Sequence, residues 1–149
     1  MNKPDIDAFH TAITARLSSR KVRYTLGRKA VVESLSKSNG PLSAAELADL
    51  HTGTIPLSSL YRSLAILEDS EIITRHFGAN GVTRYELAEW LLGHHHHLVC
   101  TSCGTVEDVS LPSSYESQIH TLVEEVGKLS SFQAKNHILD IEGICLRCT

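Results

Sequence analysis

One stretch decides the fold of the second half of the chain: Gly93-His94-His95-His96-His97-Leu98-Val99-Cys100-Thr101-Ser102-Cys103-Gly104. It places four consecutive imidazoles before a C-x-x-C pair, and a second such pair, Cys145 and Cys148, lies near the end of the sequence. Imidazole and thiolate are preferred ligands of zinc and of other first-row metals. The stretch therefore predicts a metal-binding protein with more than one site.

The cysteines predict a closed zinc site. Two residues between the members of each pair allow a tight turn to aim both sulfurs at one ion, and Gly104 gives the first turn its freedom. Four thiolates complete a tetrahedral shell with no position left for a substrate, which is typical of structural zinc. The expected ligands of this Zn²⁺ are Cys100, Cys103, Cys145 and Cys148. A redox dithiol is the alternative, in which the second pair would be a coincidence.

The histidine run predicts two further sites, because alternate side chains of a strand point to opposite faces. His94 and His96 share one face, and Glu116 and His137 are available there as further ligands. The spacing from Ser113 to Glu116 also fits a capping box, so Glu116 is either a ligand or a helix cap. A strand histidine without a metal is the alternative for His137.

The opposite face carries His95 and His97, close to an expected junction between two domains. The further ligands available to it are Asp108 in the same domain and, from the preceding domain, Glu86, Glu89 or His76. The residues leave these last three open. A site with ligands from both domains would fix the angle between them, so that metal binding becomes a switch.

Composition bounds the class of protein. The chain has 149 residues, of which 42% are hydrophobic and 21% charged, as in one ordinary soluble domain or two small ones. No apolar run approaches the roughly 18 to 20 residues of a membrane span, and the first residues lack the layout of a signal peptide. We therefore expect a cytoplasmic protein with no membrane partner, whose cysteines bind metal rather than form disulfides.

Charge favours nucleic acid as a partner of the first part of the chain. Residues 1–93 hold 11 Lys and Arg against 10 Asp and Glu, whereas residues 94–149 hold 3 against 7. The clustered basic residues are Arg16, Arg20, Lys21, Arg23, Arg28 and Lys29. Such a cluster is an electrostatic footprint for nucleic acid, although a solvated helix face explains it about equally well.

Apolar periodicity predicts four helices in the first half. The first helix has the apolar face Ile6, Phe9, Ile13 and Leu17, and the second runs from the N-cap Thr25 to Ser38–Pro41 with Leu26 and Leu35 inward. The third helix opens at the capping box Ser43–Glu46 and includes Leu47 and Leu50. The fourth helix starts near Leu57. The fourth leaves a polar face of Ser58, Ser59, Tyr61, Arg62 and Ser63. This layout is typical of a helix-turn-helix, whose second helix presents its N-terminal residues to the DNA major groove.

Two β-rich runs, Ile72–Phe77 and Val82–Leu87, flank Gly78-Ala79-Asn80-Gly81 and predict a hairpin, the wing of a winged helix. Arg75 and Arg84 of this wing could contact phosphate. Beyond it we expect a hinge at residues 88–93, strands at Leu98–Val99, Thr105–Val109 and about Phe132–Ile141, and a helix from Ser113 to Val126 that Gly127 stops. The expected class is α+β, with a winged helix-turn-helix domain at residues 1–87 and an α/β domain with a three-stranded sheet at residues 94–149.

Three segments together resemble the ferric uptake regulator (Fur) family, and they lie at Leu60-Tyr61-Arg62-Ser63-Leu64, His94–Gly104 and His137–Cys148. The resemblance covers nearly the whole chain. It implies a homodimeric, metal-dependent repressor that binds double-stranded operator DNA, controls zinc or iron uptake genes and has no small-molecule substrate. By the same resemblance, residues 94–149 are the dimerisation domain. The four-histidine run is most similar to the zinc-uptake-regulator (Zur) type.

The resemblance also implies roles for single residues. Tyr61 and Arg62 match the recognition-helix pair, and Arg23 and Arg28 match basic positions of the N-terminal helices. The cysteines match structural zinc ligands, His94, His96, Glu116 and His137 match an inter-strand site, and His95, His97 and Asp108 match the sensory site. Many members place a sensory histidine where this chain has Pro41-Leu42, so that ligand is missing or replaced by His76. The longer hinge leaves Glu86 against Glu89 open.

The sensed metal is expected to be Zn²⁺ or Fe²⁺, with Mn²⁺ or Ni²⁺ as alternatives, because imidazole and carboxylate suit all four. A peroxide-sensing member of the family is a further alternative. A zinc hydrolase would need an open metal site with a general base, and the sequence has no H-E-x-x-H. A metal-storing dimer without DNA function is a third class, in which replacing Tyr61 and Arg62 would change nothing.

Overall fold

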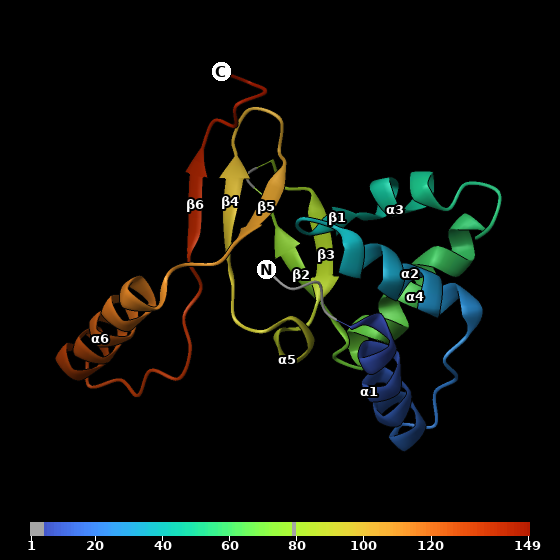
Figure 1. Ribbon diagram of the computed structural model, residues 1–149, viewed down its shortest axis with the longest axis horizontal. Coiled ribbons are helices and arrows are strands. Elements are labelled where there is room, and N and C mark those ends of the chain that lie inside the picture. Colours follow the sequence, from blue (N-terminus) through green and yellow to red (C-terminus); the bar gives the residue numbers. More distant parts are fainter. Residues whose placement is uncertain (1–4, 79) are drawn as a thin grey trace.

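A computed structural model of the protein describes residues 5–78 and 80–149 (Figure 1). Residues 1–4, on which the signal-peptide expectation rests, and Ala79 of the predicted turn lie outside the described residues. The N-terminal half comprises α1 (Ile6–Ser19), α2 (Leu26–Lys37), β1 (Leu42–Ser43), α3 (Ala44–Leu50), α4 (Leu57–Asp69), β2 (Ile73–Phe77) and β3 (Thr83–Leu87). The C-terminal half comprises α5 (Glu89–Leu92), β4 (His96–Cys100), β5 (Val106–Val109), α6 (Ser113–Leu129) and β6 (Asp140–Gly143).

The predicted helices of the N-terminal half are confirmed, and their start signals work as expected. The side chain of Thr25 accepts a hydrogen bond from the backbone N–H of Arg28 at the start of α2. Ser43 and Glu46 form a reciprocal capping box that opens α3. The three-stranded sheet has the order β1-β3-β2, and β2 and β3 pair antiparallel as the predicted wing.

One apolar core holds the N-terminal half together. Leu47, Leu60, Leu64 and Leu67 are almost completely buried and pack with residues of α1, α2 and the wing. One predicted core position was wrong: Leu26 is 84% exposed because it is the first residue of α2 and lies beyond the packed turns. Leu50 belongs to α3 as predicted and is 63% exposed at its end. Ser63 of the predicted polar face is buried instead.

The C-terminal sheet has the order β5-β4-β6, so β4, which carries the last two histidines of the run and Cys100, lies in the middle. β5 pairs with β4 antiparallel and sets Asp108 opposite His97. β6 pairs with β4 parallel and sets Asp140 opposite the same histidine. The predicted hinge contains a single short helix, α5, which follows the wing and ends at Leu92, just before Gly93.

Two predictions for the C-terminal half were wrong. The last strand covers Asp140–Gly143 rather than Phe132–Ile141, because its partner β4 is short and pairing begins where the N–H of His97 donates to the carbonyl of Leu139. The helix α6 continues past Gly127 to Leu129. A Cβ at Gly127 would lie 2.6 Å from the carbonyl oxygen of Phe132, so this glycine permits a close return of the chain rather than stopping the helix.

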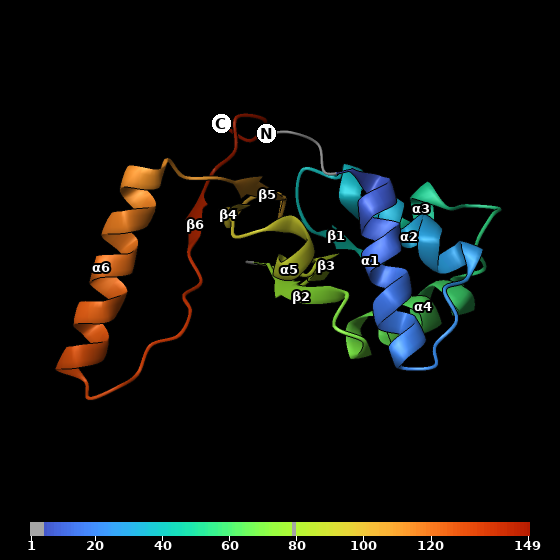
Figure 2. The same ribbon diagram turned by 60° about the horizontal axis from the view of Figure 1, so that its bottom comes forward.

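Helix α6 lies apart from the other helices, on the far side of the C-terminal sheet in both views (Figures 1 and 2). Its apolar side chains are largely open to solvent: Leu122, Val126 and Leu129 are 58%, 52% and 88% exposed. Among the described residues, the helices are too short or too polar to cross a lipid bilayer.

Candidate metal centres

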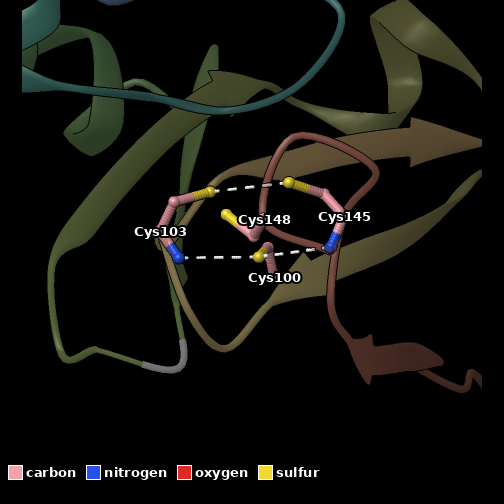
Figure 3. A group of neighbouring side chains, drawn as sticks. All are labelled: Cys100, Cys103, Cys145 and Cys148. Atoms are coloured by element: carbon pink, nitrogen blue, oxygen red, sulfur yellow. Dashed lines mark hydrogen bonds between the residues drawn. The ribbon is translucent and has the colours of Figure 1, made fainter.

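The four cysteines come together at the end of the C-terminal sheet (Figure 3). Cys100 ends β4, Cys103 lies in the turn that follows, and Cys145 and Cys148 lie in the segment after β6. The four sulfurs all lie within 4.8 Å of one another, and those of Cys103 and Cys145 are 3.8 Å apart. Gly104 takes a φ of +75°, the left-handed conformation that closes this turn.

The protein environment favours thiolate at the first of these sulfurs. The backbone N–H groups of Cys103 and Cys145 donate to the Cys100 sulfur at 3.5 and 3.4 Å, and they lower the pKa of this thiol to about 6. At Cys148 a hydrogen bond with Ser102 acts in the same direction, but the neighbouring cysteine sulfurs outweigh it and raise the pKa to about 11. The last proton is therefore hard to remove unless a cation balances the charge, as a tetrathiolate zinc site requires.

A second cluster lies between β4 and α6 and contains His94, His96, Glu116 and His137. The Nε2 of His96 donates to a carboxylate oxygen of Glu116 at 2.7 Å, and the Nε2 atoms of His94 and His137 lie 3.2 Å apart. Glu116 is not a helix cap, since α6 begins after Pro112 without a side-chain cap bond. The other carboxylate oxygen of Glu116 is buried with no hydrogen-bond partner in the described part of the chain. A divalent cation would satisfy it.

Glu89 belongs beside this second cluster. Its carboxylate lies 2.6 Å from Nδ1 of His94, where it accepts the proton of that ring and leaves Nε2 directed at His137. The structure therefore does not bring Glu89 to the histidines of the opposite face. A carboxylate that holds the outer nitrogen of a metal-binding histidine is a common arrangement in metal sites.

The third cluster joins the two halves of the molecule. It contains Glu86 from β3, His95 just before β4, His97 in β4 and Asp108 in β5. One oxygen of Glu86 accepts from Nε2 of both histidines, at 3.0 and 3.1 Å. Oδ1 of Asp108 lies 3.7 and 3.6 Å from the same nitrogens and is buried with no hydrogen bond in the described residues. We call this group the hinge cluster.

The hinge cluster forms hydrogen-bonded ion pairs between Glu86 and its two histidines without a metal. Burial alone would raise the pKa of Glu86, but hydrogen bonds from His95 and His97 outweigh it and lower the pKa to about 2. The same bond to Glu86 raises the pKa of His95 to about 9 against the effect of burial. For His97 burial is again outweighed, and its pKa is raised. Burial raises the pKa of Asp108. Protons thus occupy the nitrogens to which a metal would bind.

His76 lies outside the hinge cluster, although it is close to it. Its Nε2 lies 3.0 Å from Oδ2 of Asp140, whose Oδ1 lies 3.2 Å from Nδ1 of His97. These three residues form a fourth group whose ligand atoms lie within 4.8 Å of one another. Asp140 was not among the ligands predicted from the sequence. The available signal was one acidic residue within an apolar strand, Ile138-Leu139-Asp140-Ile141, between His137 and the last cysteine pair.

The predicted DNA-contacting side chains lie mostly on the surface of the N-terminal half. Tyr61, Arg62 and Ser58 are exposed on α4, Ser59 is half-buried, and Arg23 is exposed before α2. Arg28 is half-buried and donates to the carbonyl of Arg23. The structure thus brings the pair Tyr61 and Arg62 to solvent at the start of the same helix.

The expectation that wing arginines reach phosphate is not met at Arg84. This side chain is buried and donates to the carboxylate of Glu46 at 2.8 Å, so it fixes α3 to β3. Arg75 is paired with Glu68 at 2.7 Å. Both are held by the fold of the N-terminal half itself.

Comparisons with known proteins agree with this geometry. Residues 19–142 match the Ferric uptake regulator family. The chain is 30% identical over 141 residues to the ferric uptake regulation protein of Bacillus subtilis (strain 168). This alignment covers 91% of each sequence. It is 31% identical to the crystal structure of the Vibrio cholerae ferric uptake regulator, with a TM-score of 0.68 over 87% of this chain and 96% of that one.

The similarity in fold to solved structures extends over nearly the whole chain. The Helicobacter pylori ferric uptake regulator superposes with a TM-score of 0.77 over 99% of this chain and 96% of that one, at 22% identity. Proteins of this kind regulate transcription, so the zinc hydrolase alternative is excluded. The chain belongs to the ferric uptake regulator family of metal-responsive transcription regulators.

Proposed function

We propose that this protein is a metal-dependent DNA-binding repressor in which an ion at the hinge cluster sets the DNA-reading arrangement. One observation carries the proposal: the cluster takes Glu86 from the wing and His95, His97 and Asp108 from the C-terminal half. An ion held by all four would fix one half against the other. Its binding energy would then favour one arrangement of the two halves.

The proposed ligand sets follow the three complete clusters. Structural Zn²⁺ is held by Cys100, Cys103, Cys145 and Cys148, the regulatory ion by Glu86, His95, His97 and Asp108, and a second inter-strand ion by His94, His96, Glu116 and His137. Nitrogen and oxygen ligands suit Zn²⁺ or Fe²⁺ at the regulatory site. The proposed division of the chain is a DNA-binding domain at residues 1–87, a hinge at 88–93 and a dimerisation domain at 94–149.

The proposed DNA contacts lie on α4 and before α2. The N-terminal part of α4 presents Ser58, Tyr61 and Arg62 to solvent, as expected for a helix that enters the major groove. Arg23 and Arg28 would contact phosphate and position the domain. The related Vibrio cholerae protein is described as having DNA-binding domains, which supports the same role here.

The partner that covers the apolar side of the C-terminal half is proposed to be a second copy of the chain. Leu122 and Val126 of α6 are exposed, as are Ile138 before β6 and Ile141 within it. Burying such side chains in a symmetric interface stabilises a homodimer, and two winged helices would then address the two halves of an operator.

The test is a gel shift on the protein's own promoter region, with the tetrathiolate zinc retained throughout. Specific binding should appear on addition of Zn²⁺ or Fe²⁺, disappear with a mild chelator, and weaken steeply with salt because phosphate contacts release counterions. Titration of Mn²⁺ and Ni²⁺ in the same assay ranks the metals. Binding that is indifferent to the chelator overturns the regulatory role of the hinge cluster.

Two variants separate the parts of this proposal. His95→Ala should abolish the response to metal, and Arg62→Ala should weaken specific binding at saturating metal, by roughly 1–3 kcal/mol if Arg62 contacts a base. Lys128→Ala, which removes one positive charge from α6, is the control and should bind DNA normally. Normal repression by Arg62→Ala would favour a metal-storing protein instead.

A further inference from the structure

We propose that Asp140 and His76 position His97 for metal binding and connect the hinge cluster to the wing strand β2. This inference rests on the proposed function, since it assumes that His97 binds the regulatory ion. It adds two residues that belong to none of the three complete clusters and gives them a mechanical role.

The two nitrogens of His97 point to different partners. Nε2 lies 3.1 Å from Glu86 and 3.6 Å from Asp108, inside the hinge cluster. Nδ1 lies 3.2 Å from Oδ1 of Asp140, outside it. With Asp140 as acceptor, the ring keeps a proton on Nδ1 and leaves the lone pair of Nε2 for an ion. Asp140 thus selects both the tautomer and the orientation of His97 that metal binding needs.

The carboxylate of Asp140 carries the contact onward. Its second oxygen, Oδ2, accepts from Nε2 of His76, which is buried on β2, at 3.0 Å. The rings of His76 and His97 also pack at a tilt, with centroids 4.5 Å apart. Register places β2 beside β3, with Thr74 opposite Glu86. The wing therefore meets the hinge cluster twice, through Glu86 on β3 and through His76 on β2, which reaches His97 by way of Asp140 on β6.

These three residues fit a positioning chain better than a separate metal site. They offer one ligand atom each, Asp140 bridges the two histidines, and His97 also belongs to the four-residue hinge cluster. An ion bound to Nδ1 of His97 would have to displace the proton that Asp140 accepts. The hydrogen-bond distances of 3.0 and 3.2 Å on the two oxygens are those of N–H donors on a carboxylate.

Coupling between two sites is reciprocal, so the contacts from His76 through Asp140 to His97 act in both directions. An ion that fixes His97 also fixes Asp140 and His76, and so holds β2 against the C-terminal sheet. Movement of β2 that withdraws His76 frees Asp140 and with it the ring of His97, which weakens metal binding. The segment before α3 offers Pro41-Leu42 and no imidazole, so the wing carries the side-chain link between the hinge cluster and the N-terminal half.

The test compares Asp140→Asn, His76→Phe and His97→Ala in the full-length protein with zinc retained at the four cysteines. All are made in a His137→Ala background, which weakens the inter-strand cluster so that added Co²⁺ reports on the hinge cluster. Phenylalanine keeps the ring packing of His76 and removes its nitrogens. Glu142→Gln, an exposed position two residues further along β6, controls for the loss of one negative charge. The measurements are the Co²⁺ affinity by chelator competition, the shape of the Co²⁺ absorption bands, and hydrogen exchange of residues 73–77 with and without Zn²⁺.

We expect Asp140→Asn to bind Co²⁺ about 10- to 100-fold more weakly with unchanged stoichiometry and band shape, because the ligands themselves remain. His76→Phe should lose less affinity, since Asp140 still holds His97. Both should lose the metal-induced protection of residues 73–77, whereas Glu142→Gln should keep it. In the Zn²⁺ form, the Nδ1 proton of His97 should exchange slowly in the parent and quickly in Asp140→Asn, a change that a merely structural role of Asp140 would not produce.

Two results overturn the inference. If Asp140→Asn matches Glu142→Gln in affinity and protection while His97→Ala loses the ion, the positioning role is wrong and the hinge site stands. If Asp140→Asn loses one equivalent of Co²⁺, Asp140 is itself a ligand. Full affinity in His97→Ala would instead overturn the proposed function on which the inference rests.

Discussion

The cysteine cluster and the hinge cluster share strand β4 and differ in where their remaining members come from. All four cysteines lie in the C-terminal half, so an ion there can fix only that half. The hinge cluster adds Glu86 of β3 to residues of β4 and β5, so an ion there fixes the relation between halves. The origin of the ligands, more than their chemistry, separates a structural site from a regulatory one.

The metal-free states of the two clusters differ as well. Four crowded sulfurs resist the loss of their last proton, as the pKa of about 11 for Cys148 shows, and a cation is needed to hold them together as thiolates. The hinge cluster instead pairs the carboxylate of Glu86 with protonated His95 without an ion, and leaves Oδ1 of Asp108 without a hydrogen bond in the described residues. A site with two stable states suits reversible sensing, whereas a site with one suits a permanent ion.

The largest expected effect is at the cysteines. Cys145→Ser should abolish zinc retention and the folded C-terminal sheet together, because the binding energy of a structural zinc is folding energy, about 10–16 kcal/mol in zinc-finger peptides. Zinc content by elemental analysis and far-UV circular dichroism measure both. Leu146→Ala, 93% exposed between Cys145 and Cys148, should retain the zinc. A folded, zinc-free Cys145→Ser dimer would remove the distinction between the clusters.

The next effect is at the hinge. Glu86→Gln should retain the structural zinc and the overall fold but lose metal-dependent DNA binding, because it removes the ligand that comes from the wing. The loss of affinity for the regulatory ion should exceed the roughly 10- to 100-fold effect of changing a partner of a ligand. Isothermal titration with Zn²⁺ and the gel shift measure it. Retained metal response in this variant would favour Glu89 or His76 as the ligand.

Proton competition at the hinge gives a third, graded effect. His95 must release its proton to bind an ion, and its pKa is raised to about 9, so apparent affinity should rise by up to about tenfold per pH unit and level off above pH 9. In the metal-free protein, the His95–Glu86 pair stabilises fully below pH of about 6.5, and its contribution is lost as pH rises through about 9. Titrations of Zn²⁺ and thermal unfolding between pH 6 and 9.5 measure the two trends; affinity that does not change with pH would contradict the pairing.

The smallest effect on regulation should come from the inter-strand cluster. Glu116→Gln removes a carboxylate that contacts His96, but all members of this cluster lie in the C-terminal half. The ion at this cluster should bind more weakly. The metal concentration for half-maximal DNA binding should stay within about twofold of the parent value, which is a difference of roughly 0.4 kcal/mol in binding free energy. A large shift would show that the inter-strand cluster also takes part in switching.

Short-range patterns determined much of this molecule. The caps at Thr25 and Ser43, the apolar faces of α1 and α4 and the two C-x-x-C pairs follow from spacing within a few residues. Strand alternation also separated His94 and His96 from His95 and His97, because adjacent residues of a strand point their side chains to opposite faces. These features depend on the local backbone geometry that the residues themselves impose.

Only the tertiary structure decided which of the candidate residues come into contact. It placed Glu86 at the hinge and Glu89 at His94, buried Arg84 on Glu46, and brought Asp140 between His76 and His97. These contacts depend on which strands pair and in which register: a shift of β6 by one residue would turn Asp140 to the opposite face. Such pairing is set by the packing of the whole chain, so the histidine run by itself predicts two faces, while the register of β4, β5 and β6 decides what each face meets.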